Sequence, residues 1–165
     1  MSTIPESVRE FVAGGLWAHV VTMNRDGEPH VNLCWAGFDG DEIVFASFFD
    51  AKRAARLRRD PRVTLSFQAK EYDGGALFPY LVINGRASVE DGGALAVMDH
   101  LAEWYIGPGE KYPAREFPPG WTFRVTIERI YGQAIARYGG AARPGHGHAD
   151  HDDRGEREKV VERGA

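Results

Sequence analysis

The stretch LWAHVVTMNRDGEPHVNLCWAGFDGDEIVFASFF, residues 16–49, carries the strongest indication of the fold. It contains three runs rich in Val, Ile, Phe and Trp, residue types that favour β-strands. Asp-Gly dipeptides at 26–27 and 39–40 separate the runs, and Asp-Gly is a strong signal for a hairpin turn. The stretch therefore predicts an antiparallel meander of three strands, over 16–23, 29–38 and 42–49.

The residues on either side extend this pattern. A short amphipathic helix precedes the meander and is predicted to end at Gly14 and Gly15. Further strands are predicted over 62–69, 80–89 and 121–136, and Gly85 is a candidate for a β-bulge. Helical spacing of apolar residues lies between the last two strands. The fold class predicted is mainly β (α+β): a six-stranded, mostly antiparallel barrel with short flanking helices.

Composition divides the chain into two parts. Of its 165 residues, 43% are hydrophobic and 27% are charged, which fits a globular domain, predicted over 1–138. Residues 139–165 hold almost no apolar side chains and are predicted to form a flexible charged tail. The tail contains a tract of His and Asp from His146 to Asp153 that could bind a metal, but incidental histidines are the preferred interpretation.

Charge and targeting signals narrow the function classes. The formal net charge of −4 argues against a general nucleic-acid-binding protein. Apolar runs are too short to span a membrane, and the N-terminus lacks the pattern of a signal peptide. Cys34 is the one cysteine in the sequence, so an internal disulfide is impossible. These features predict a cytoplasmic protein.

The densest charge run, SFFDAKRAARLRRDPRV at residues 47–63, follows the third predicted strand. It predicts a short helix with Asp50 as the N-cap. Lys52, Arg56 and Arg59 share one face of this helix, with Arg53 beside them. A helix N-terminus next to cations suits a phosphate group, with Ser47 as a hydroxyl donor. The alternative is a solvated basic helix, because charge runs are common on surfaces.

The segments TMNRDGEPHVNLCW, GDEIVFASFFDAKRAARLRRDPRV, YLVINGRASV and WYIGPGEKYP occur in an informative order. In that order they resemble the pyridoxamine-phosphate-oxidase-like split barrels, and are more closely similar to the flavin/deazaflavin oxidoreductases that bind coenzyme F420. The resemblance covers roughly residues 5–133. It implies an FMN-binding-type split barrel, a homodimer with a cofactor site at each side of the interface, and hydride transfer to or from a small organic substrate.

The resemblance also implies site residues, by position. Ser47, Lys52 and Arg53 would hold the cofactor phosphate, and Arg56 would face the additional negative charge of F420. The ring system would lie along the second strand and beside Phe48. The strand positions concerned are Asn32, Leu33, Cys34 and Trp35. Tyr80 and the segment WYIGPGEKYP, residues 104–113, would be candidates for the wall supplied by the partner subunit. Whether Lys52 or Arg53 makes the first phosphate contact stays open, because the expected lysine position is occupied by Arg53.

Four functions remain in competition at this point. They are an F420-dependent oxidoreductase, an FMN-dependent oxidase or reductase, a non-enzymatic binder of flavin or haem, and a nucleic-acid-binding module. The cations form one short patch without interleaved aromatic residues, which disfavours nucleic acid. No nucleophile paired with a base is evident, so catalytic residues stay unassigned. A flavin or deazaflavin would carry the hydride itself. The Arg-rich helix favours F420 over FMN.

Overall fold

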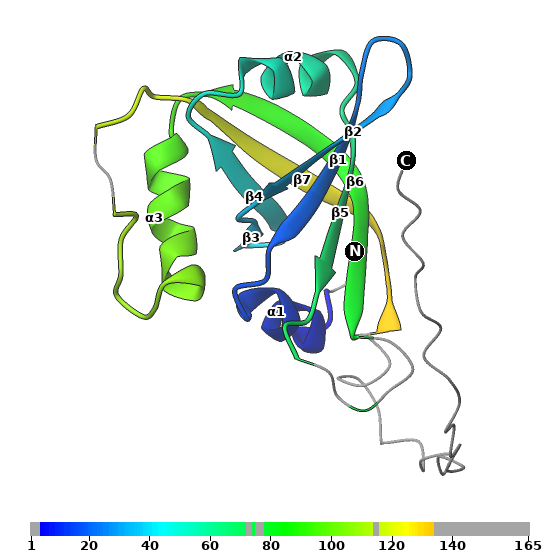
Figure 1. Ribbon diagram of the computed structural model, residues 1–165, viewed down its shortest axis with the longest axis vertical. Coiled ribbons are helices and arrows are strands. Elements are labelled where there is room, and N and C mark those ends of the chain that lie inside the picture. Colours follow the sequence, from blue (N-terminus) through cyan, green and yellow to red (C-terminus); the bar gives the residue numbers. More distant parts are fainter. Residues whose placement is uncertain (1–3, 72–73, 75–77, 114–115, 134–165) are drawn as a thin grey trace, which may run out of the picture.

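A computed structural model describes residues 4–71, 74, 78–113 and 116–133. Within these ranges, seven strands form one antiparallel sheet, and three helices surround it (Figure 1). The strands are β1 (Ala18–Met23), β2 (Pro29–Cys34), β3 (Gly37–Asp39), β4 (Glu42–Ser47), β5 (Arg62–Gln68), β6 (Tyr80–Asp91) and β7 (Trp121–Tyr131). The predicted tail and its His/Asp tract lie outside the described residues, so both stay predictions.

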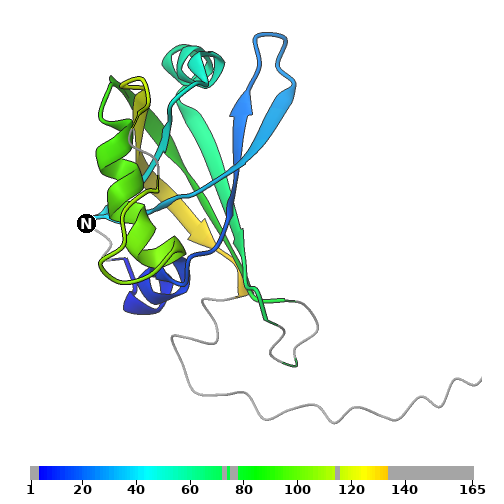
Figure 2. The same ribbon diagram turned by 60° about the vertical axis from the view of Figure 1, so that its left-hand side comes forward.

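The helices are α1 (Glu6–Ala13), α2 (Ala51–Arg59) and α3 (Ala94–Tyr105). Figure 2 shows α1 and α2 at opposite ends of the curved sheet, while α3 packs against the outer face of the sheet. As predicted, α1 ends at Gly14, and Asp50 is the N-cap of α2. In the described part of the chain, none of the helices is long and apolar enough to cross a membrane.

The strand order is β2-β1-β5-β6-β7-β4-β3, with every neighbouring pair antiparallel. The two end strands, β2 and β3, are consecutive in the sequence. Trp35 and Ala36 connect them, so the sheet curls and brings its two end strands together. The chain itself joins these two strands, which are not hydrogen-bonded to each other as neighbours in the sheet. This arrangement is a split barrel, and the split lies at Trp35.

The predicted six-strand count is therefore wrong by one strand. Residues 29–38 form two short strands: β2 pairs with β1, and β3 pairs with β4. Both Asp-Gly hairpins are confirmed, but β2 and β4 do not pair as a simple meander requires. The pattern of β-forming residues continues through Trp35, and periodicity alone gives no sign that the strand changes partners there. Gly85 is confirmed as an irregularity, since the β6–β7 register shifts between Asn84 and Gly85.

Two apolar cores hold the sheet. The larger fills the barrel interior under α1 and contains Phe45 and Phe123, whose rings stack at 4.8 Å. The smaller lies between the outer face of β4 and α3, where Val44 and Ala46 meet Leu101. Because alternate residues of a strand face opposite sides, β4 is buried on both faces and is held firmly. The turn that follows β4 is thus attached to a rigid strand.

Candidate functional site

The turn from β4 into α2 is ordered by its own side chains. The backbone N–H of Asp50 donates to Ser47 Oγ at 3.0 Å, and the Arg53 N–H donates to Asp50 Oδ1 at 2.9 Å. A carboxylate at this position satisfies one of the unpaired amides at the start of the helix. The geometry leaves the Ser47 hydroxyl hydrogen available to a ligand.

Arg53 points inward from α2. Only 6% of its surface is exposed, and its guanidinium carbon lies 5.9 Å from the ring centroids of Phe45 and Phe123. Its Nε atom is 3.2 Å from Asp50 Oδ2, an ion-pair distance. Among the described residues, however, that buried N–H has no partner with hydrogen-bond geometry. A buried donor without a partner is costly, so this N–H would gain from donating a hydrogen bond to a ligand oxygen.

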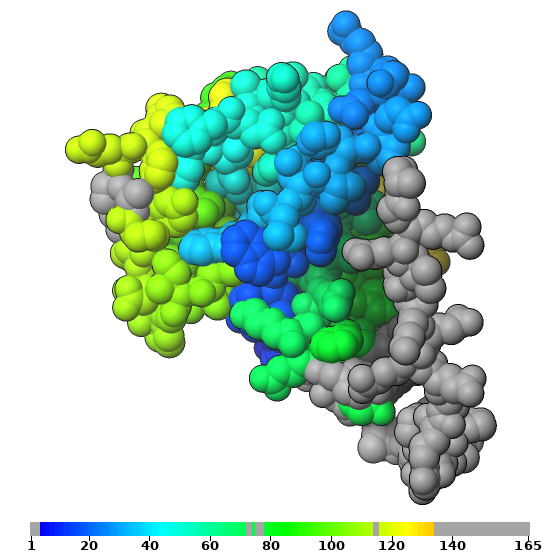
Figure 3. Space-filling view, viewed as in Figure 1, coloured from blue at the N-terminus to red at the C-terminus, as the bar shows by residue number. Residues whose placement is uncertain are grey.

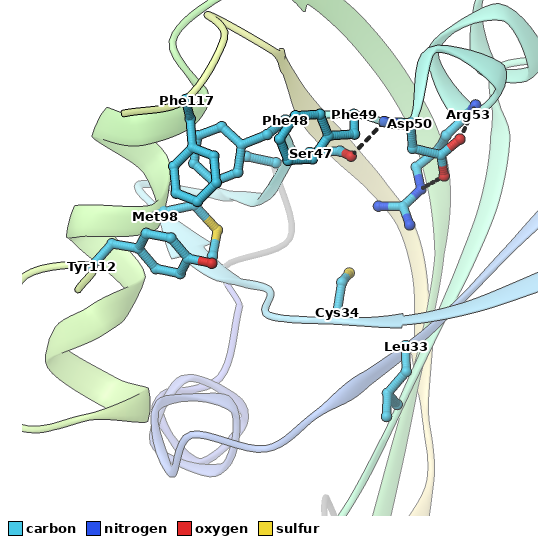
Figure 4. Close-up of a pocket in the computed structure, with 11 residues that line it drawn as sticks. Leu33, Cys34, Ser47, Phe48, Phe49, Asp50, Arg53, Met98, Tyr112 and Phe117 are labelled. Atoms are coloured by element: carbon cyan, nitrogen blue, oxygen red, sulfur yellow. Dashed lines mark hydrogen bonds and ion pairs between the residues drawn. The ribbon is translucent and has the colours of Figure 1, made fainter. Parts of the chain in front are cut away.

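Arg53, Ser47 and Asp50 open into a cleft of about 490 Å³ on the face shown in Figure 3. The surface is hollowed there between β2, the start of α2, and α3. Its lining residues are Leu33, Cys34, Ala46, Ser47, Phe48, Phe49, Asp50, Arg53, Met98, Tyr112 and Phe117. Figure 4 shows the polar groups of the Ser47–Arg53 turn on one side and the aromatic rings on the other.

The aromatic side of the cleft is one packed cluster. Phe48 stacks on Phe117 with ring centroids 4.1 Å apart, and Tyr112 lies 5.7 Å from Phe48. Asp99 of α3 fixes this loop, because its carboxylate accepts the Tyr112 N–H at 2.9 Å. Phe49 is 73% exposed at the cleft rim. The cleft therefore combines a flat apolar wall with a cationic end, as ligand sites for phosphorylated ring systems require.

Cys34 lies on the β2 side of the cleft and is half-buried. Burial raises the pKa of its thiol from 9.0 to about 11, and the nearby Arg53 guanidinium offsets part of that rise. The thiol is therefore neutral at physiological pH. It packs at the floor of the cleft as a small apolar group and is a poor nucleophile.

The other two cations expected at the site, Arg56 and Lys52, do not line the cleft. Arg56 is buried beside Arg53, where its Nε donates to Thr22 Oγ1 at 3.1 Å. Its Nη2 is 3.8 Å from Asp50 Oδ2. Lys52 is exposed and does not line the cleft. α2 turns Arg53 and Arg56 inward together with Leu57, while Lys52 and Arg59 stay exposed, so the three cations expected on one face differ in burial. Their role in binding an anion stays a prediction.

Three further predicted residues lie outside the cleft lining. Asn32 is half-buried two residues before Cys34 on β2. Trp35 stacks on Tyr105 at 4.7 Å and contacts the Tyr112 ring edge-on, so it supports the cleft wall from behind. Tyr80 pairs with Gln68 at the far end of β5, roughly 20 Å along the strand from α2. Within one chain, Tyr80 is thus remote from the cleft.

Sequence reasoning missed Met98 and Phe117 of the wall and Phe49 at its rim, and it assigned Tyr112 to a partner subunit. Met98 had the helical spacing of a core residue, and Phe117 lies in a Pro-rich loop without periodicity. Tyr112 belongs to the segment WYIGPGEKYP that the resemblance assigned to a partner subunit, yet it lines the cleft of its own chain. The signal that could have found Phe117 and Tyr112 is the density of aromatic residues in a loop otherwise made of turn-forming residues.

Comparison with known proteins identifies the fold. A family model described as "Pyridoxamine 5'-phosphate oxidase" matches residues 4–134. A search of the curated proteins found no match.

Solved structures resemble the chain over most of its length. An F420 reductase has a TM-score of 0.62 at 22% sequence identity, covering 78% of this chain and 98% of that one. A conserved hypothetical protein from Mycobacterium tuberculosis has a TM-score of 0.65 at 19% identity, covering 89% and 94%. An FAD-binding protein from Mesorhizobium loti has a TM-score of 0.53 at 20% identity, covering 78% and 94%. At these identities the similarity establishes the fold.

Proposed function

The chain belongs to the pyridoxamine 5'-phosphate oxidase family of split barrels, and on that premise we propose that it is an F420-dependent oxidoreductase acting on a small organic substrate. The observation that carries the proposal is the cleft at the β4–α2 turn. One end offers a hydroxyl and a buried arginine with an unsatisfied N–H, and the other is a wall of aromatic rings. This pairing fits a ring system that carries a phosphate.

The residues present fit such a cofactor. Ser47 and Arg53 would hold the phosphate, since a guanidinium suits phosphate oxygens better than an ammonium group does. The ring would lie over Leu33 and Cys34, beside Phe48. When bound, a deazaflavin supplies the hydride chemistry, so the chain's own contribution is binding, orientation and exclusion of water. This also accounts for a site in which no nucleophile–base pair is assigned.

The choice of F420 over FMN rests on charge. F420 carries an oligoglutamate chain beyond its phosphate, and α2 presents further cations toward solvent. Lys52 is exposed next to the cleft end of the helix, and it would meet that extended negative charge and not the phosphate itself. A solved F420 reductase shares this fold, which is consistent with the choice.

We also propose that the protein is a homodimer whose partner completes each site. Apolar side chains on the outer face of the β2 edge are unusually exposed: Val31 is 54% and Leu33 is 53% exposed. Trp17, just before β1, is 50% exposed. Leu33 also lines the cleft, so a second copy that covered this apolar face would close the cleft mouth.

Equilibrium titration tests the proposed function. Purified protein is titrated with F420 and, separately, with FMN, and fluorescence reports binding. The proposal predicts micromolar or tighter binding of F420 and weaker binding of FMN. Micromolar FMN binding without detectable F420 binding would make the FMN-dependent alternative correct. Light scattering should give about twice the 18.3 kDa chain mass.

A further inference from the structure

The carboxylate of Asp50 lies beside the two buried arginines at the cationic end of the cleft. It caps the first turn of α2 through the Arg53 N–H at 2.9 Å. Its second oxygen lies 3.2 Å from Arg53 Nε and 3.8 Å from Arg56 Nη2. Asp50 also lines the cleft. An incoming phosphate would therefore meet a fixed negative charge beside the cation that attracts it.

The local charge balance follows from these contacts. Two buried guanidinium groups, Arg53 and Arg56, share this one carboxylate among the described residues. Among these three buried or half-buried groups, a single net positive charge is left at the cleft end of α2, while Lys52 stays exposed to solvent. Such a site matches a ligand with one negative charge at its phosphate. A second negative charge on the phosphate would lie near Asp50 without a buried cation to neutralise it, which is costly where groups are partly desolvated.

We propose that Asp50 is a specificity-determining residue that favours a phosphodiester monoanion over a phosphate monoester dianion. The inference rests on the proposed function, because it concerns the phosphate end of the same cleft. F420 carries its phosphate as a diester with one negative charge, whereas the monoester of FMN carries about 1.5 to 2 near pH 7. Asp50 therefore selects against FMN through its charge, independently of any contact to the ring.

The substitution Asp50→Asn removes the charge and keeps the shape. Asn is as good an N-cap as Asp, so the amide of Arg53 stays satisfied and the helix start is retained. Asp60→Asn is the matched control. It removes one negative charge at the other end of α2, a nine-residue helix of roughly 14 Å, which exceeds the screening length of about 8 Å at physiological salt. Melting temperatures of both variants verify that the fold is intact.

The experiment measures dissociation constants of FMN and F420 for the wild-type chain and both variants. The change of the ratio of the two constants from the wild type to a variant cancels the contribution of the rings. Asp50→Asn should improve FMN affinity on the order of tenfold more than F420 affinity. The reason is that the FMN phosphate carries a further negative charge, whose repulsion by the Asp50 carboxylate disappears in this variant. Asp60→Asn should leave the ratio within about twofold, since screening weakens distant surface charges.

Three results overturn the inference and leave the proposed function in place. If Asp50→Asn raised the affinities for FMN and F420 equally, the charge of Asp50 would repel both ligands alike and would not discriminate between them. Weaker binding of FMN in that variant would mean that Asp50 positions Arg53 for the phosphate. If Asp60→Asn changed the ratio of the two dissociation constants as much as Asp50→Asn does, the location of Asp50 at the cleft would not matter for the discrimination. Binding of neither ligand by any of the three proteins would refute the proposed function itself, and the inference with it. A cleft that binds both cofactors with an unchanged ratio refutes only the role of Asp50.

Discussion

The hydroxyl of Tyr105, at the end of α3, accepts a hydrogen bond from the backbone N–H of Ala36 at 3.0 Å. It donates in turn to the carbonyl of Leu16. A single side chain thus ties α3 to the entry of β1 and to the point where β2 gives way to β3. Burial raises the pKa of this phenol, so the hydroxyl stays protonated across the physiological range and keeps its donor role.

Tyr105→Phe should destabilise the protein by about 1–3 kcal/mol, because a part-buried N–H and a carbonyl would lose their partner. Urea unfolding measures the change. Tyr131→Phe is the matched control, since Tyr131 is 41% exposed, and it should cost less than about 0.5 kcal/mol. Equal stability of the two variants would contradict the role assigned to Tyr105.

Gly37, the first residue of β3, lies under the indole of Trp104. A Cβ atom placed there would come within 1.9 Å of Trp104 Cζ3 and 2.9 Å of Leu101 Cδ2. Gly37→Ala should therefore destabilise the fold by roughly 1–3 kcal/mol through overpacking. Gly27→Ala is not a neutral control, since its φ is +88° and Ala is strained there. Trp104→Phe combined with Gly37→Ala should recover part of the loss, and no recovery would mean that the clash lies elsewhere.

Much of this fold could be predicted from the residues because local signals agree with the tertiary structure. The Asp-Gly turns, the Asp50 cap and the Gly85 irregularity each have a local cause. The split at Trp35 could not be predicted, because strand-forming residues continue past it and the Ala36 amide at the change of partner is bound by Tyr105, far along the chain. The burial of Arg53 and Arg56 was missed for a related reason. Charged side chains are expected to face solvent, but here the Thr22 hydroxyl accepts a hydrogen bond from Arg56 and the Asp50 carboxylate pairs with Arg53.

The Cys34 thiol reports on the cleft directly, since it is the one cysteine of the sequence. With a pKa of about 11 in place of 9.0, alkylation by iodoacetamide at pH 8 should be about a hundredfold slower than for a free thiol. The rate should rise about tenfold per pH unit up to pH 10, because the thiolate fraction does. Bound F420 should slow it further. A rate that levels off near pH 8 would contradict the burial of this thiol.

In the proposed function, Arg53 and not Lys52 holds the cofactor phosphate. The most direct measurement is the F420 affinity of Arg53→Gln and Lys52→Gln at two salt concentrations, with melting temperatures to verify folding. A charged hydrogen bond contributes on the order of 1.5–3 kcal/mol, so Arg53→Gln should weaken binding about ten- to a hundredfold at either salt. Lys52→Gln should cost less than about threefold, and that loss should vanish at high salt because the side chain is exposed. Equal losses in the two variants, or no loss in Arg53→Gln, would contradict the account.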